Sequence, residues 1–322
     1  MTGISNREAL DLMGAEGTEF YDLMHRAGRL RSEHDDRGIS LCAILNAKSG
    51  HCPQDCVFCA QSSHNQATIE TYPLMSADRM VAAADRARRD GARHFSIVTS
   101  GKAVTAESEV AAIAAAIRRI SDMESLSACA SLGILSVEVL TRLRDAGLHR
   151  FHHNLETAES FFPNICTTSA YADRVRTIEA AKSIGLSVCA GGLFGMGESR
   201  QQRVELLATL RDLEVDSVPI NFLNPIPGTK LEHMDDLSPM EALRIIAVAR
   251  LMMPDREIRI AGGRMRNLRD LHSWIFLAGA NGLMIGDYLT TTGRRVDDDL
   301  TLLADQGLYP VGRSPDGPQE PN

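Results

Sequence analysis

Short apolar stretches alternate with longer amphipathic stretches along most of the chain, and this alternation predicts the fold. The short stretches have the length and apolar content of buried strands, whereas the longer ones repeat apolar residues every three or four positions, as a helix face does. We expect strands at residues 39–47, 93–99, 126–132, 150–156, 186–192, 217–223, 257–262 and 282–286. We expect helices at residues 76–91, 107–122, 136–147, 170–185, 199–213, 238–253, 267–280 and 297–307.

Eight strands that alternate with helices favour an α/β fold, specifically a (β/α)8 TIM barrel. A doubly wound open sheet is the alternative. Two amphipathic runs before the first strand predict an N-terminal helical extension over residues 1–38, so the barrel would span residues 39–290. Residues 291–322 would form a C-terminal helix and a tail that is disordered, because the tail is rich in Pro and Gly.

One face of the predicted strands is polar. Because side chains at positions i and i+2 of a strand share a face, each strand can be divided into two sets. One set reads Ser127, Cys129, Ser131; His152, Asn154, Glu156; Ser187, Cys189, Gly191; Ser217, Pro219, Asn221; and Arg259. In a barrel covered by helices this set points inward, where a purely structural barrel has Val, Ile and Leu. The sequence therefore predicts a polar cavity that contains thiols.

Composition narrows the class of protein. The 322 residues are 44% hydrophobic and 24% charged with a net charge of −8, as in a globular protein with no basic face for nucleic acid. The N-terminus lacks a signal-peptide pattern, and no apolar run is long enough to span a membrane. We therefore expect a cytoplasmic protein, in which clustered cysteines act as metal ligands or catalytic groups.

Three cysteines form a C-x3-C-x2-C motif directly after the first predicted strand: Cys52, Cys56 and Cys59. Three thiolates satisfy three irons of a 4Fe–4S cluster and leave the fourth open to a substrate group. Phe58 would pack beside a bound planar group. A structural zinc site is the alternative, because tetrahedral zinc needs a fourth ligand that His51 or His64 could supply.

The motif resembles the signature of the radical S-adenosylmethionine (SAM) enzymes. The segments NAKSGHCPQDCVFCAQSS, HNLET, VCAGGLFGMGE, SVPINFLNPIPGT, AVARLMMP and IRIAGGR further resemble the biotin synthase family, in the family's order and over roughly residues 38–290. The resemblance implies radical insertion of sulfur into dethiobiotin at C6 and C9. No side chain is expected to act as the catalytic group, because no side-chain base removes a proton from an alkane carbon.

The resemblance also implies roles for individual residues. The three motif cysteines would hold the 4Fe–4S cluster that binds SAM. Residues expected near SAM are Phe58, Asn154, Glu156, Gly191, Gly192 and Glu198, and those expected near dethiobiotin are His152, Asn154 and Asn221. The glycines could instead form a plain turn, and the polar residues could be satisfied within the strand ends. The chain departs from the family's usual NHNLDT, because His152 replaces Asn and Glu156 replaces Asp.

A second, auxiliary iron–sulfur cluster would supply the sulfur. In the better-known biotin synthases it is a 2Fe–2S cluster held by three strand cysteines and an arginine. This chain has Cys129, Cys189 and Arg259 at matching positions, but Ser96 where the third cysteine is expected. A hydroxyl is a poor ligand for iron–sulfur centres, which prefer thiolates.

The thiols outside the motif are Cys42, Cys129, Cys166 and Cys189. Four thiolates suit a four-iron cluster, and the chain resembles a second type of biotin synthase with a 4Fe–5S auxiliary cluster. We expect these four to ligate the auxiliary cluster, with Arg259 near it or ligating it. Buried free cysteines are the alternative.

The resemblance implies a flavodoxin or ferredoxin electron donor and a homodimer. Two other functions remain open. One is a different radical SAM enzyme of similar barrel design, such as a hydrogenase-cofactor maturase or methylornithine synthase. The other is a non-catalytic protein whose cysteine-rich loop holds structural zinc.

Overall fold

A computed structural model describes residues 3–35 and 37–312 of the chain. A parallel sheet closes on itself, because β1 pairs with β2 on one side and with β9 on the other. The strands are β1 (Gly38–Lys48), β2 (His94–Thr99), β3 (Ser127–Ser131), β4 (Arg150–His152), β5 (Ser187–Cys189), β6 (Gly192–Phe194), β7 (Ser217–Phe222), β8 (Glu257–Ile260), β9 (Gly282–Met284) and β10 (Tyr309–Pro310). Closure confirms the predicted barrel and excludes the open sheet.

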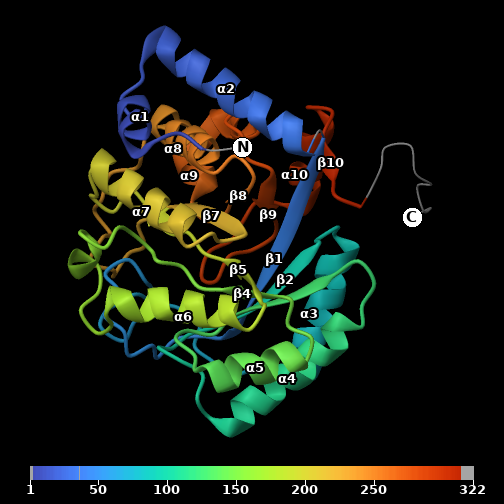
Figure 1. The fold of residues 1–322 in the computed structure, drawn as a ribbon. Helices are drawn as coiled ribbons and strands as arrows, with labels where there is room; N and C mark the ends of the chain where they lie inside the picture. The colour runs from blue at the N-terminus through green and yellow to red at the C-terminus, as the bar shows by residue number, and fades with distance from the viewer. Residues whose placement is uncertain (1–2, 36, 313–322) are drawn as a thin grey trace.

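Helices cover the outside of the barrel (Figure 1). They are α1 (Asn6–Leu12), α2 (Gly17–Asp35), α3 (Ala77–Arg89), α4 (Glu107–Ser121), α5 (Val137–Asp145), η1 (Phe162–Asn164), α6 (Tyr171–Ser183), α7 (Arg200–Asp212), α8 (Pro239–Met252), α9 (Arg264–Leu268), η2 (Arg269–Ile275) and α10 (Val296–Ala304). The side chains of Ser76, Ser136, Ser199 and Ser238 accept hydrogen bonds at the first turns of α3, α5, α7 and α8 and so cap these helices.

The N-terminal helices form a second layer over one part of the barrel. Helix α2 packs on α8, and α1 contacts α7 and α8 (Figure 1). Because α8 lies between α2 and the sheet, all of its residues from Ala242 to Met252 are buried. This explains why residues 242–252 of α8 are apolar apart from Arg244 and Arg250, which are themselves buried.

Three predicted elements differ from the structure. The strand predicted at 150–156 ends at His152, and the strand predicted at 186–192 is split into β5 and β6, which both pair with β7. The split occurs because the Asn154 side chain, not a strand backbone, accepts the Gly191 N–H at 3.1 Å. The helix predicted at 267–280 is instead the short α9 and the 3-10 helix η2, separated at Arg269, whose φ is +48°.

The C-terminal segment adds a strand that the sequence did not predict. After α10 the chain forms β10, which pairs in parallel with the first residues of β1. The tail predicted to be disordered comprises residues 312–322, and all of it except Gly312 lies outside the described residues.

Candidate functional site

The motif cysteines lie in the long loop between β1 and α3, at the carboxyl end of the barrel strands. All three line one cavity of about 200 Å³, together with Phe58 and residues of β2, β3 and the loop after β4. Asn65 shapes this loop, because its side-chain amide donates to the backbone oxygens of Cys56 at 3.0 Å and Cys59 at 2.9 Å. Burial raises the pKa of Cys59 to about 11. The loop thus presents three thiols to this cavity, which we call the mouth cavity.

A carboxylate ties this loop to a segment more than a hundred residues away. Asp55 accepts the backbone N–H groups of Thr167 at 2.9 Å and Thr168 at 3.1 Å, and both threonine hydroxyls as well. A backbone hydrogen bond from Val57 to the oxygen of Ile165, at 3.0 Å, extends the contact. Partial burial acts to raise the pKa of Asp55, but the hydrogen bonds from Thr167 and Thr168 outweigh burial and hold this pKa well below its usual range.

This contact decides where Cys166 lies. Hydrogen bonding with Cys56, aided by Ser169 and Thr168 and opposed by burial, lowers the pKa of Cys166 to about 5. The other predicted auxiliary ligands, Cys42, Cys129 and Cys189, line a second cavity deeper in the barrel, which we call the interior cavity. Cys166 does not line it. The structure therefore separates Cys166 from the thiols with which the sequence grouped it, because the loop after η1 folds back onto the motif loop.

Polar residues after β4 form one wall of the mouth cavity. The Asn154 side-chain oxygen lies 3.0 Å from Nε2 of His152 and accepts the Gly191 N–H. The Asn154 amide group lies 3.5 Å from a carboxylate oxygen of Glu156, whose pKa is raised by burial. Glu156 has a φ of +70°, a left-handed conformation that turns the chain away from the strand direction.

Arg174 joins this wall and was not among the predicted site residues. Its guanidinium donates to the backbone oxygen of Asn154 at 2.9 Å and lies 3.7 Å from the Glu156 carboxylate. It also stacks over Phe162, 5.4 Å from the ring centroid. The sequence signal for it is an arginine on the buried face of α6, at helical spacing from Tyr171 and Ile178. A buried cation of this kind requires an anionic partner, which here is Glu156.

The Glu198 carboxylate is hydrogen-bonded to other groups of the protein. Its carboxylate accepts the N–H groups of Gly195 at 2.9 Å and Met196 at 2.8 Å, and it pairs with Nε of the buried Arg203 at 2.7 Å. Only 2% of the Glu198 side chain is exposed. The structure thus places Glu198 as a brace of the GGLFGMGE turn, not facing the cavity where SAM was expected.

The two predicted glycines are required by neighbouring backbone. A Cβ on Gly191 would lie 2.0 Å from the oxygen of Pro219, and one on Gly192 would lie 2.7 Å from the oxygen of Glu156. Close packing of β5 and β6 against their neighbours therefore explains both residues without a ligand. Asn221 also has partners within the protein. Its side-chain amide group donates to the Gly192 backbone oxygen, and its side-chain oxygen accepts the Gly262 N–H at the rim of the barrel.

A second cavity lies deeper in the barrel. Cys42, Cys129 and Cys189 line it from three strands, and Ser96 and Arg259 line it from two more. Strand register sets Ser96 beside Cys129 and His152 beside Cys189. The cavity is narrow, about 30 Å³, so admitting any cluster requires the lining side chains to move apart. His152 lines both this cavity and the mouth cavity and so borders the two spaces.

Arg150 and Arg259 line the interior cavity, and Glu257, which pairs with both, completes a charged group that we call the floor of the cavity. Glu257 binds Nε of Arg259 at 2.7 Å, lies 3.5 Å from Arg150, and accepts the Ser217 hydroxyl at 2.9 Å. Two guanidinium groups thus face one carboxylate in the barrel interior, which leaves an excess positive charge beneath the thiols. Burial raises the pKa of Cys129 to about 12 and that of Cys189 to about 11, and both arginines oppose the shift.

The donor set fits iron–sulfur clusters better than a single ion. Among residues 3–35 and 37–312, no three His, Cys, Asp or Glu side chains converge tightly enough to hold one metal ion. In a cluster each cysteine binds a different iron, so the thiols need only face a shared space, as both cavities show. The Ser96 hydroxyl adds to this fit, since it is buried at the interior cavity and has no hydrogen-bond partner among the described residues.

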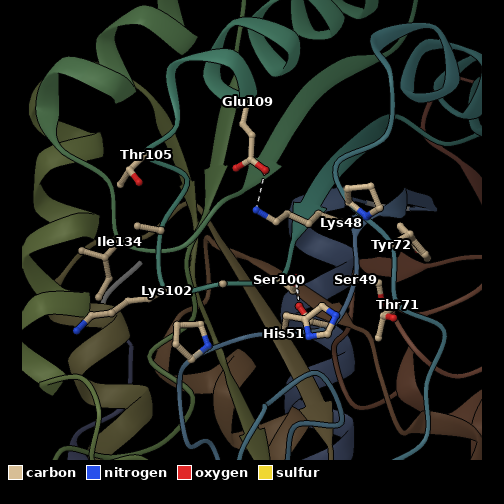
Figure 2. Close-up of a pocket in the computed structure, with 15 residues that line it drawn as sticks. Lys48, Ser49, His51, Thr71, Tyr72, Ser100, Lys102, Thr105, Glu109 and Ile134 are labelled. Carbon is tan, nitrogen blue, oxygen red and sulfur yellow. Dashed lines mark hydrogen bonds and ion pairs between the residues drawn. The ribbon is translucent and has the colours of Figure 1, made fainter.

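A wider cleft of about 820 Å³ opens beside the mouth cavity. Figure 2 shows Lys48 reaching Glu109 across it, at 2.7 Å, and the Ser100 hydroxyl near the loop of His51, where it donates to the Gly50 oxygen at 2.7 Å. Residues Ser100 to Lys102 line both the cleft and the mouth cavity. The cleft therefore adjoins the space that contains the motif cysteines.

None of the helices in the described part of the chain is long and apolar enough to cross a membrane.

Two protein-family models match most of the chain. Residues 48–210 match the Radical SAM superfamily, and residues 219–309 match the Biotin and Thiamin Synthesis associated domain. A biotin synthase of Citrifermentans bemidjiense is 50% identical over 308 residues, which cover 96% of this chain and 94% of the relative. A biotin synthase of Geotalea uraniireducens is 48% identical and covers 95% and 93%.

Solved structures with the same fold are more distant in sequence. A structure of methylornithine synthase has a TM-score of 0.83 at 20% identity and covers 96% of this chain and 94% of its own. A structure of a FeFe-hydrogenase maturase has a TM-score of 0.82 at 16% identity and covers 97% and 73%. At these identities the likeness concerns the fold alone.

Proposed function

The chain belongs to the biotin synthase family of radical SAM enzymes, and from this premise we propose how its own residues divide the work of inserting sulfur into dethiobiotin. Relatives about 50% identical over nearly the whole chain decide against the zinc protein and the other radical SAM enzymes considered from the sequence. The observation that carries the residue-level proposal is the pair of thiol-lined cavities that share His152.

The mouth cavity is the proposed SAM site. Cys52, Cys56 and Cys59 would hold a 4Fe–4S cluster with one iron left for SAM, and such a cluster supplies the electron that cleaves SAM. Asn154 and Glu156 line the cavity and are held in place by Arg174. These side chains would orient SAM and exclude water, while Phe58 closes another part of the wall.

The interior cavity is the proposed site of the auxiliary cluster that donates sulfur. Cys42, Cys129 and Cys189 would ligate it, and the positive floor formed by Arg259, Arg150 and Glu257 would balance the charge of the thiolates. We retain the four-iron type as the proposal, with a 2Fe–2S cluster as the alternative. Cys166 is left out of this ligand set because it lies against Cys56.

Dethiobiotin would bind between the two cavities. His152 borders both and is bonded to Asn154, so it is the residue best placed to contact a substrate that must meet both groups. Burial lowers the pKa of His152 to about 4, and its imidazole is therefore neutral near pH 7. Asn221 would contribute from the rim, next to Gly262.

Three further proposals rest on the family resemblance: a flavodoxin or ferredoxin as electron donor, a homodimer, and a cytoplasmic location. Reduction by each donor protein, sedimentation of the pure protein and cell fractionation would test them separately.

Anaerobic reconstitution followed by iron and sulfide counting tests the assignment of the two cavities. Two four-iron clusters predict about eight irons per chain, and a four-iron plus a two-iron cluster predict about six. Replacement of Cys42, Cys129 or Cys189 by Ala should remove only the auxiliary irons and abolish biotin formation from dethiobiotin and SAM. A full iron complement in all three variants would refute the auxiliary site.

A further inference from the structure

His94 faces the interior cavity from the first position of β2. It lines the cavity together with the three thiols, and its Nδ1 lies 3.9 Å from the Cys129 sulfur. Strand register sets His94 directly beside Cys42 on β1. Since His94 and Ser96 are two residues apart on one strand, they point to the same side of the sheet. An imidazole therefore stands among the three thiols, at a strand that lacks the expected cysteine.

The unpartnered Ser96 hydroxyl gives independent support for a bound group at this place. Ser96 is 6% exposed, and its hydroxyl finds no hydrogen-bond partner in the part of the chain that the structure describes. Burial of a hydroxyl without a partner is costly. A bound acceptor in the cavity would satisfy it. The hydroxyl is a weak ligand for iron but a good donor to sulfide or thiolate sulfur.

We propose that His94 is a protein ligand of the auxiliary cluster, completing with Cys42, Cys129 and Cys189 a set of three thiolates and one imidazole, while Ser96 donates a hydrogen bond to the bound cluster. This proposal rests on the proposed function, because it presumes that the interior cavity holds the cluster. Imidazole is an established ligand in place of cysteine in iron–sulfur centres, where it raises the reduction potential. Four donors then face the cavity without Cys166.

The arrangement of charges favours this assignment over ligation by a carboxylate. Glu257, the acidic residue at the cavity floor, is already bound to Arg259, Arg150 and Ser217. His94 instead stacks on His149, with ring centroids 6.1 Å apart, which leaves its edge directed at Cys129. An imidazole adds no negative charge to the three thiolates, so the excess positive charge of the floor remains available to balance them.

The test uses full-length protein in which Cys52, Cys56 and Cys59 are replaced by Ala, so that only the auxiliary cluster remains after anaerobic reconstitution. Pulsed EPR of the reduced cluster should show hyperfine coupling to a histidine nitrogen, and labelling histidine with ¹⁵N should change that coupling. His94→Cys should retain the irons and lose the coupling. His94→Ala should lose most of the auxiliary irons, whereas His149→Ala, which alters the stacked ring outside the cavity, should keep both the irons and the coupling.

Other results would disprove either the role of His94 as a ligand or the assignment of the cluster to this cavity. If the cluster forms but shows no histidine coupling, or if His94→Ala keeps irons and coupling, His94 is not a ligand. If Cys129→Ala retains every auxiliary iron as well, the cavity does not hold the cluster and the proposed function of this site fails. Because His152 also lines the cavity, histidine coupling in the parent protein is assigned to His94 by its loss in His94→Cys. That variant keeps a ligand at the position, so misfolding of His94→Ala would not obscure the answer.

Discussion

The Asp55 carboxylate and the backbone N–H of Thr167 are 2.9 Å apart, which joins the motif loop to the segment after η1. Because Asp55 lies between two motif cysteines, we expect Asp55→Ala to loosen the loop. Iron should then pass to a chelator several-fold faster from the SAM-site cluster of the reconstituted protein. Asp122→Ala, which changes an exposed residue at the end of α4, serves as the control. Equal rates for the two variants would show that the contact does not hold the cluster loop.

Cys166 provides a direct test of which thiols act together. The structure places it against Cys56, so we expect Cys166→Ala to retain the auxiliary irons that Cys42→Ala loses. Iron counting and the EPR spectrum of each reconstituted variant measure this. Loss of about four irons from both variants would instead restore the ligand set predicted from the sequence.

Glu198 should prove important for stability more than for direct contact with SAM. Its removal leaves Arg203 buried beside an unbraced turn, so Glu198→Ala should lower the free energy of unfolding by about 3 kcal/mol. Glu179→Ala, at an exposed position of α6, should change it little. Urea unfolding measures both. A stable Glu198→Ala protein with greatly weakened SAM binding would contradict the structural role.

Buried neutral histidines predict a loss of stability in mild acid. Burial lowers the pKa of His153 to about 3, while the same residue in the unfolded chain titrates near 6.5. As the pH falls through 6.5, His153 is protonated in the unfolded chain but not in the folded protein. The stabilisation that is present at higher pH is therefore lost. Between pH 7.5 and 6.0 this amounts to roughly 0.8 kcal/mol for one histidine. Urea unfolding at both pH values should show a smaller decrease for His153→Leu than for the parent, and equal decreases would exclude this contribution.

The sequence by itself determined the barrel, the strand faces and the motif. Alternation of strand and helix patterns requires a layered α/β fold, and a period of two along each strand fixes that Cys129, Cys189 and Arg259 share the inward side. The motif cysteines are close in sequence, so a single loop was enough to bring them together. These features are local, and local patterns are what a sequence displays directly.

Only the tertiary structure decided which distant side chains meet. Closure of β1 on β9 brings Cys42 to the other interior thiols, while the fold of the segment after η1 takes Cys166 away to Cys56. The partners of Glu198 and Arg174 likewise could not be predicted from the sequence. The residue type alone does not tell whether a carboxylate or guanidinium faces a ligand, a turn or another charge. Hydrogen bonds and ion pairs form between groups that closure places within about 3 Å, and no spacing along the chain encodes that distance.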